Sequence, residues 1–194
     1  MWKKSMRKSK RTIEEEAQAL LDELEIQTVP VPLDKIARAL GARVSYTNLD
    51  EELSGMVYIK DSIAIIGVNS LHHPHRQRFT LAHEIAHLHL HRDEITHSVH
   101  VDKRFTETVL RRDQRSSKGI DDKEIEANQF AAALLMPREK LFEALEEAEL
   151  DVEDEQALDD LARRFKVSKA TLQYRIRNLA LGRVRRVRSA SGRG

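Results

Sequence analysis

The chain has 194 residues, of which 40% are apolar and 34% are charged, and its formal net charge is +1. This length and composition allow one domain, or one domain with a small module, while the absence of cysteine excludes a disulfide framework and zinc sites built on thiolates. No apolar run approaches the roughly 20 residues of a membrane span, so we expect a cytoplasmic protein with no membrane partner.

Positive charge is concentrated at the two ends of the chain. Met1 to Arg11 and Arg183 to Gly194 are rich in Lys or Arg and contain no acidic residue. Basic tails often contact nucleic acid through its phosphates. The same composition is typical of solvated, disordered ends. We therefore expect disordered tails over residues 1–12 and 183–194, with contact to DNA as an open alternative.

The first part of the chain predicts two helices followed by a small sheet. Apolar residues at helical spacing predict a helix over Ile13 to Ile26, and a second helix is expected from about Leu33 to Leu40, ended by Gly41. Asp61 and Ser62 read as a tight turn between two strands, so we expect an antiparallel sheet. Its strands are expected at Ala42 to Tyr46, Gly55 to Ile59 and Ile63 to Val68.

The remainder of the chain predicts five helices and one long polar stretch. That stretch, Arg92 to Gly119, is longer than an ordinary connection, and loops of this length are usually functional or mobile. We hypothesise that it restricts access to a cleft. The helices are expected at Pro74 to about His91, Lys123 to Met136, Pro137 to Ala148, about Gln156 to Phe165, and Ser168 to Leu181.

The helix predicted from Pro74 contains the pattern HExxH, His83-Glu84-Ile85-Ala86-His87. Residues four apart share nearly one face of a helix, so His83 and His87 can direct ring nitrogens at one metal ion. Glu84 directly follows His83 and can reach a water bound to that ion. Such a pattern also arises by chance. Here, however, the flanking residues are apolar, and buried histidine and glutamate side chains are costly unless a ligand such as a metal compensates them.

A catalytic zinc site needs a third protein ligand and one open position. Three histidines along one straight helix span about 12 Å, too far to share one ion, so His91 is expected beside the ligands or at the surface. Glu124 on a later helix is our choice of third ligand, and Glu126, on another face, is the second choice. Asn128 is expected to hydrogen-bond the far nitrogen of a liganding histidine. Two histidines and one carboxylate suit Zn²⁺ and also Mn²⁺ or Fe²⁺.

The residues around these two helices are specific in combination. Arg78-Phe79-Thr80 precedes the segment HEIAHLHLH, and EIEANQFAAALLMP follows at Glu124 to Pro137. With them the chain resembles the ImmA/IrrE family of metallo-endopeptidases. The resemblance covers about residues 15 to 181.

The resemblance implies an α+β fold with a mostly helical, thermolysin-like (zincin-like) metallopeptidase core. We place this core at residues 13–150, with the small antiparallel sheet inside it. It implies His83, His87 and Glu124 as zinc ligands and Glu84 as the catalytic base. Family members cut or inactivate a helix-turn-helix repressor and so switch on mobile-element or stress-response genes. The implied protein substrate is therefore a repressor of that class.

The chemistry expected at such a site is hydrolysis of a peptide bond. Zinc would polarise the scissile carbonyl and lower the pKa of a water. Glu84 would take the proton of that water and pass it to the leaving amine. The oxyanion needs another donor besides the metal, and the sequence offers Tyr58, His97 and His100 without choosing among them.

Residues 151–182 form a predicted helix-turn-helix-like pair, packed on the core or following it, with Ser168 as the N-cap of its second helix. The alternative function is therefore a DNA-binding regulator whose metal site is structural or relict. In the other interpretation the pair packs on the peptidase core and helps to shape the substrate site. The residues able to meet phosphates or bases are Lys169, Gln173, Arg175 and Arg177. The sequence does not identify the repressor, the activating signal or the oligomeric state.

Overall fold

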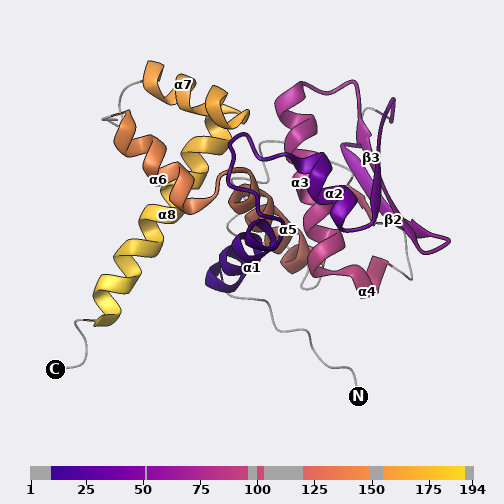
Figure 1. Cartoon of the computed structure of the whole chain (residues 1–194), viewed down its shortest axis with the longest axis horizontal. Coiled ribbons are helices and arrows are strands. Elements are labelled where there is room, and N and C mark those ends of the chain that lie inside the picture. The colour runs from indigo at the N-terminus through magenta and orange to yellow at the C-terminus, as the bar shows by residue number, and fades with distance from the viewer. Residues whose placement is uncertain (1–9, 51, 96–99, 103–119, 149–154, 191–194) are drawn as a thin grey trace.

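The structure is a computed structural model, and it describes residues 10–50, 52–95, 100–102, 120–148 and 155–190. In this part of the chain, helices α1 to α8 accompany a four-stranded sheet, so the fold is α+β and mostly helical, as predicted. The sheet lies at one end of the molecule and α6, α7 and α8 at the other, with α3 and α5 between them (Figure 1). Among the described helices, none combines the length and apolar character of a bilayer-spanning segment.

The elements follow the chain in the order α1 (Lys10–Glu23), α2 (Leu33–Ala39), β1 (Ala42–Thr47), β2 (Gly55–Lys60), β3 (Ile63–Asn69), α3 (Pro74–Leu90), α4 (Arg92–Ile95), β4 (His100–Asp102), α5 (Ile120–Leu135), α6 (Arg138–Glu147), α7 (Glu155–Phe165) and α8 (Lys169–Ala190). Each predicted helix is present. Helix α4 and strand β4 were not predicted, and both fall inside the stretch expected to be a loop. One turn of helix and a three-residue strand carry too little periodicity to be recognised.

The sheet is mixed, and the prediction of an antiparallel sheet was wrong for β1. The strand order is β1-β3-β2-β4; β1 pairs with β3 in parallel, whereas β2 is antiparallel to both β3 and β4. Ala64, Ile66 and Val68 of β3 are each 0% exposed. Because β3 carries this fully buried face, it takes an interior position in the sheet, with β2 on one side. Strand β1 pairs with the other side of β3 and does not pair with β2.

Two predicted turns are confirmed. Gly41 follows α2 with a φ of 76°, the left-handed conformation expected of a glycine just past a helix end. Asp61 and Ser62 have φ values of 51° and 64°, and the pairing of Lys60 with Ile63 closes a two-residue hairpin around them.

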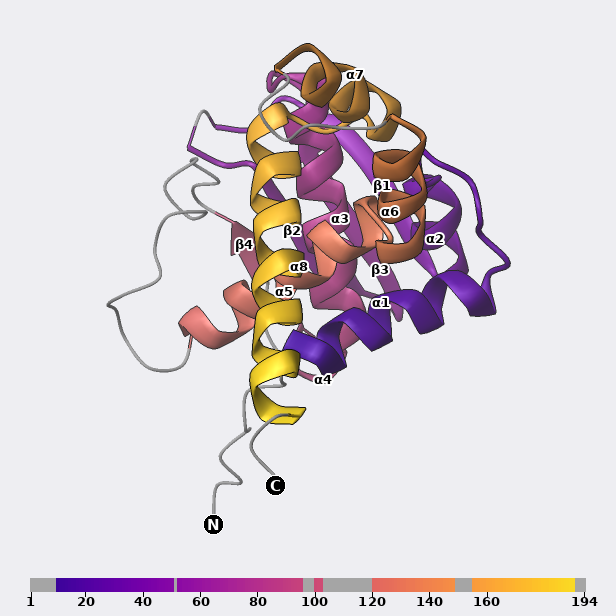
Figure 2. The same ribbon diagram turned by 90° about the vertical axis from the view of Figure 1, so that its left-hand side faces the viewer.

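Helix α3 is the centre of the packing. Its residues from Phe79 to Leu88 are all buried, because one side of the helix meets the sheet and the other meets α5. Ala127 and Ala131 of α5 are each 0% exposed, and small residues at a helix contact let two backbones approach closely. Helices α1 and α8 in turn pack on α5, and Figure 2 shows α8 crossing in front of it.

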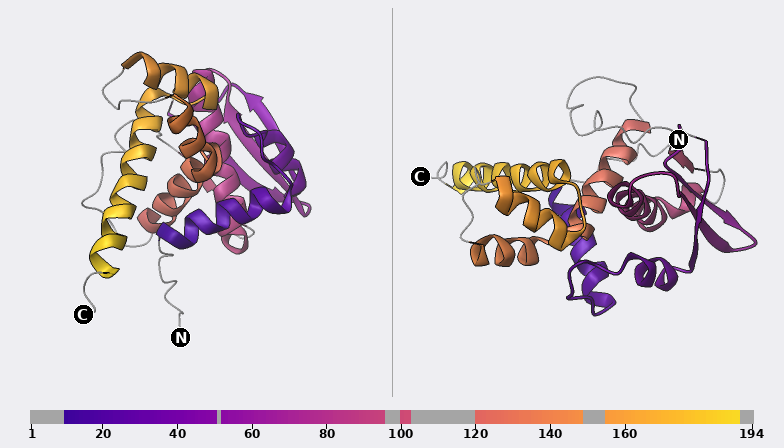
Figure 3. Two further views of the ribbon diagram at one scale, coloured as in Figure 1. Left: turned by 60° about the vertical axis from the view of Figure 1, so that its left-hand side comes forward. Right: turned by 90° about the horizontal axis from the view of Figure 1, so that it is seen from above.

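Helices α7 and α8 share the core of the rest of the chain. Leu158, Phe165 and Leu172 belong to one hydrophobic cluster with the buried residues of α1, α3 and α5. The amide of Thr171 donates to Ser168 Oγ at 3.1 Å, which confirms the predicted N-cap. Figure 3 shows α7 lying across the start of α8, with the rest of α8 extending away from it. Helix α8 continues to Ala190, through residues that the sequence analysis assigned to a disordered basic tail.

Candidate metal centre

His83 and His87 meet Glu124 where α3 packs on α5. The side chains of His83 and His87 are 1% and 2% exposed, and their Nε2 atoms lie 3.0 Å apart. Glu124 Oε2 lies 3.1 Å from His83 Nε2, and Oε1 lies 3.3 Å from His87 Nε2. In the described part of the chain these three residues are the group able to hold a metal ion, with ligand atoms within 4.8 Å of one another.

The spacing of these atoms fits a metal of zinc's size. Two ligands about 2.0–2.1 Å from a tetrahedral zinc ion lie roughly 3.3–3.4 Å apart. The three distances here, from 3.0 to 3.3 Å, are close to that value. The side chain of Glu124 is 29% exposed, so the centre is closed on its histidine side and open beside Glu124. Three protein ligands leave the fourth position of a tetrahedral zinc ion to water or substrate.

Asn128 is placed behind His83, on the side away from the centre. Its Oδ1 atom lies 3.0 Å from His83 Nδ1. An amide oxygen only accepts hydrogen bonds, so Nδ1 of His83 carries the proton in this contact. The lone pair of neutral His83 is then on Nε2, the atom that faces His87 and Glu124. Asn128 thus sets the tautomer that a metal ligand requires.

The second candidate ligand, Glu126, faces His91 instead of the centre. Its Oε2 atom lies 3.3 Å from His91 Nε2, and His91 Nδ1 lies 3.3 Å from Nδ1 of His87. Burial lowers the pKa of His91, and the hydrogen bond to Glu126 opposes that shift. His91 was expected only beside the ligands or at the surface, and its contact with Glu126 was not predicted.

Glu84 is fully buried and lies beside the backbone of β2. A Cβ atom added to Gly55 would lie 3.1 Å from Glu84 Oε1, 3.0 Å from the Gly67 carbonyl oxygen and 2.5 Å from Thr80 Cγ2. Only glycine allows the strand to pass this close to the helix. Gly55 therefore helps to define where the carboxylate of Glu84 sits.

Two of the candidate oxyanion donors, Tyr58 and His100, belong to the neighbouring strands β2 and β4. Tyr58 lies three residues after Gly55 on β2, and side chains alternate along a strand, so Tyr58 projects from the opposite face of the sheet. His100 is the first residue of β4, and its backbone pairs with Val57 of β2. His97 lies outside the described residues. The structure thus does not bring Tyr58 to Glu84.

Two of the four candidate nucleic-acid contacts form ion pairs within the protein, Arg175 in its interior and Lys169 at its surface. Arg175 is 5% exposed, and it donates to the carbonyl oxygen of Met136 at 3.0 and 3.1 Å and to Glu14 Oε2 at 2.7 Å. Lys169 Nζ lies 2.8 Å from Asp159 and 2.6 Å from Glu155, and hydrogen bonds to these carboxylates raise its pKa.

Of the other two candidate nucleic-acid contacts, Gln173 is half-buried and Arg177 is exposed.

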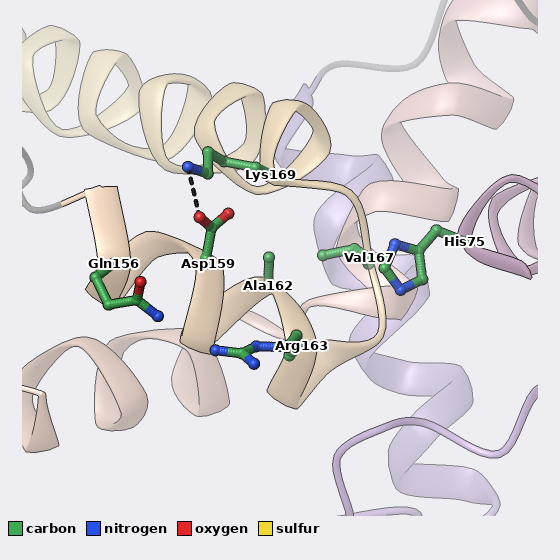
Figure 4. Close-up of a pocket in the computed structure, with 7 residues that line it drawn as sticks. All are labelled: His75, Gln156, Asp159, Ala162, Arg163, Val167 and Lys169. Atoms are coloured by element: carbon green, nitrogen blue, oxygen red, sulfur yellow. Dashed lines mark ion pairs between the residues drawn. The ribbon is translucent and has the colours of Figure 1, made fainter. Parts of the chain in front are cut away.

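Lys169 also lines a cavity of about 380 Å³ between α7, the start of α8 and His75 near the start of α3 (Figure 4). The metal-ligand candidates do not line this cavity.

Comparison with known proteins identifies the family. The chain matches, over residues 37–177, the model of a peptidase family described as the IrrE N-terminal-like domain. No curated protein matches it. A solved structure of a Mycobacterium tuberculosis transcriptional regulator is similar in fold, with a TM-score of 0.58 and 22% identity, over 84% of this chain and 46% of that one. The chain thus spans less than half of that regulator, and it belongs to the IrrE N-terminal-like family of peptidases.

Proposed function

We propose that this protein is a zinc-dependent endopeptidase that cleaves a helix-turn-helix transcriptional repressor. The observation that supports this most is the convergence of His83, His87 and Glu124, with Glu84 next to His83 on the same helix. Membership of a peptidase family supports the reaction class. The solved structure of similar fold is that of a protein named a transcriptional regulator, and this supports a role in gene regulation.

Four side chains have roles in the proposed reaction, three as metal ligands and one in proton transfer. His83, His87 and Glu124 would hold the metal, which when bound acts as a Lewis acid and lowers the pKa of a water. Glu84 accepts the proton of the attacking water and returns it to the leaving amine. The burial of the two histidines keeps bulk water from their ring nitrogens, and the exposed side of Glu124 is where a peptide can enter.

The proposed mechanism also needs a second donor to the oxyanion, besides the metal. Tyr58 belongs to the far face of the sheet, whereas β4 brings the backbone of His100 next to β2, the strand that passes Glu84. We therefore favour His100 over Tyr58 for this role. His97 stays a candidate from the sequence alone.

The test compares the wild-type protein with Glu84→Gln, both loaded with zinc. Each is incubated with purified helix-turn-helix repressors from the same genome, and new N-termini are identified by mass spectrometry. We expect the wild type to create a new N-terminus in at least one repressor. The Glu84→Gln protein should bind the same amount of zinc and create none, because the amide cannot accept the proton. Cleavage by the zinc-loaded variant at the wild-type rate contradicts the role of Glu84.

The alternative, a DNA-binding regulator that uses α7 and α8, has less support. Arg175 is directed into the core, and the charge of Lys169 is balanced by two carboxylates. Binding of duplex DNA that falls steeply with salt and is lost in Arg177→Ala would revive this alternative.

A further inference from the structure

A line of hydrogen-bonding groups runs from α5 to the metal-ligand candidates. It passes through one histidine at the C-terminal end of α3 and one histidine within that helix. It consists of Glu126, His91 and His87, with contacts of 3.3 Å at each of its two steps. We propose that His91 and Glu126 are positioning residues that hold His87 in the tautomer able to bind a metal. This inference rests on the proposed metal site, and it assigns a role to two residues outside the ligand set.

For two neutral imidazoles and an ionised carboxylate, the two hydrogen bonds of this line have only one set of directions. A carboxylate only accepts, so Nε2 of His91 donates to Glu126. A neutral imidazole with its proton on Nε2 can only accept at Nδ1. Nδ1 of His87 must therefore donate to His91. The lone pair of His87 is then on Nε2, which faces His83 and Glu124.

Without this line, His87 has a competing arrangement. With its proton on Nε2, it would donate to Glu124 Oε1, which lies 3.3 Å away. That hydrogen bond would occupy both a ligand nitrogen and a ligand oxygen. Metal binding would then require the proton to move first. His91 and Glu126 disfavour this closed state, because they need the proton of His87 on the other nitrogen.

Burial makes the line hard to replace by water. The side chains of His91 and Glu126 are each 9% exposed. Burying a carboxylate destabilises the fold unless the carboxylate is hydrogen-bonded, so Glu126 needs a partner such as His91. The arrangement also matches that of His83, whose outer partner Asn128 comes from the same helix, α5. Each liganding histidine is thus oriented from α5, one directly and the other through His91.

The test measures zinc affinity by competition with a chelator for a set of variants in the full chain. His91→Phe keeps a ring and removes both nitrogens. We expect its zinc affinity to fall about 10- to 100-fold, the range seen when an outer partner of a liganding histidine is lost. His91→Asn places an amide oxygen near the position of Nδ1, so it should retain most of the affinity. Glu126→Met removes the acceptor at the far end without altering α3, and it should also weaken binding.

His89→Asn is the matched control, because His89 lies on the same helix and contacts Glu16 at 3.5 Å and the ring of Phe130. Its zinc affinity should equal that of the wild type. A second readout uses the metal-free protein, in which nitrogen-15 NMR reports the tautomer of His87. We expect the proton on Nδ1 in the wild type and His91→Asn, and a shift toward Nε2 in His91→Phe. Unlike a loss of packing, this shift is specific to the proposed role.

The outcomes separate this inference from the proposed function. Equal zinc affinity of wild type, His91→Phe and Glu126→Met overturns the inference and leaves the metal site standing. An unchanged tautomer of His87 in metal-free His91→Phe and Glu126→Met also overturns it. A wild-type protein that takes up no zinc overturns the proposed function, and the tautomer measurement then still decides whether His91 orients His87.

Discussion

Arg175 offers a sharp test of how the C-terminal helices are held to the rest of the protein. Met136 follows the last residue of α5, and the final carbonyls of a helix lack intrahelical donors. The guanidinium of Arg175 supplies donors to the carbonyl oxygen of Met136, with Nε at 3.1 Å and Nη2 at 3.0 Å. It also meets Glu14 of α1 at 2.7 Å, so one side chain of α8 joins α1 and the end of α5. We predict that Arg175→Ala destabilises the whole fold.

The size of the effect follows from what the substitution leaves behind. A buried carbonyl that loses its donors costs about 1–3 kcal/mol. Glu14 is 26% exposed, so water screens its charge, and its loss of a partner adds roughly 1 kcal/mol. We therefore expect a loss of about 3 kcal/mol, which for a chain of this length lowers the melting temperature by roughly 6–12 °C.

The assay is thermal and urea unfolding followed by circular dichroism, on metal-free protein so that ligand binding does not contribute. Arg177→Ala is the matched control, because Arg177 lies on the same helix and is exposed. It should change the free energy of unfolding by less than about 0.5 kcal/mol. Equal stability of Arg175→Ala and Arg177→Ala would refute this account of Arg175 and return it to the set of candidate DNA contacts.

Two further predictions concern the centre itself. Glu124→Ala should lower zinc affinity, measured by chelator competition, by more than the roughly 100-fold lost when a hydrogen-bond partner of a ligand is removed. Glu139→Ala, on the exposed side of α6, should leave the zinc affinity unchanged. Retained zinc affinity in Glu124→Ala would exclude Glu124 as a ligand. Gly55→Ala should cost about 1–3 kcal/mol in unfolding free energy and reduce repressor cleavage, because its Cβ meets Thr80 at 2.5 Å and Glu84 at 3.1 Å. Gly67→Ala, whose Cβ meets the flexible side chain of Met56 at 3.2 Å, should cleave normally, and equal cleavage by both variants would count against a role for Gly55.

The sequence was most informative where a short-range pattern decides the structure. The apolar spacing of the helices, the glycine after α2 and the turn at Asp61 and Ser62 all depend on neighbours along the chain. The HExxH spacing belongs to the same class, because one helix alone fixes the relation between His83 and His87. These features were predicted and are present.

The sequence was least informative where distant segments choose their partners. Nothing in the alternation of β1 shows that β3, rather than β2, will be its neighbour, so the parallel pairing was missed. Arg175 was one of the four candidate nucleic-acid contacts, although its position in the sequence also carried a signal for burial. It lies three residues after Leu172 and four before Leu179, on the apolar stripe of α8. An arginine on such a stripe indicates an internal partner.

His91 shows how a sound helical argument can still overlook a functional contact. Three histidines on one straight helix cannot share a metal, and the structure keeps His91 out of the ligand set. His91, however, is the residue at which α3 ends, with a φ of −128°. Because the chain leaves helical geometry there, its ring reaches both His87 and Glu126 of α5. The end of the helix thus places the third histidine behind the second, where it can orient a ligand instead of being one.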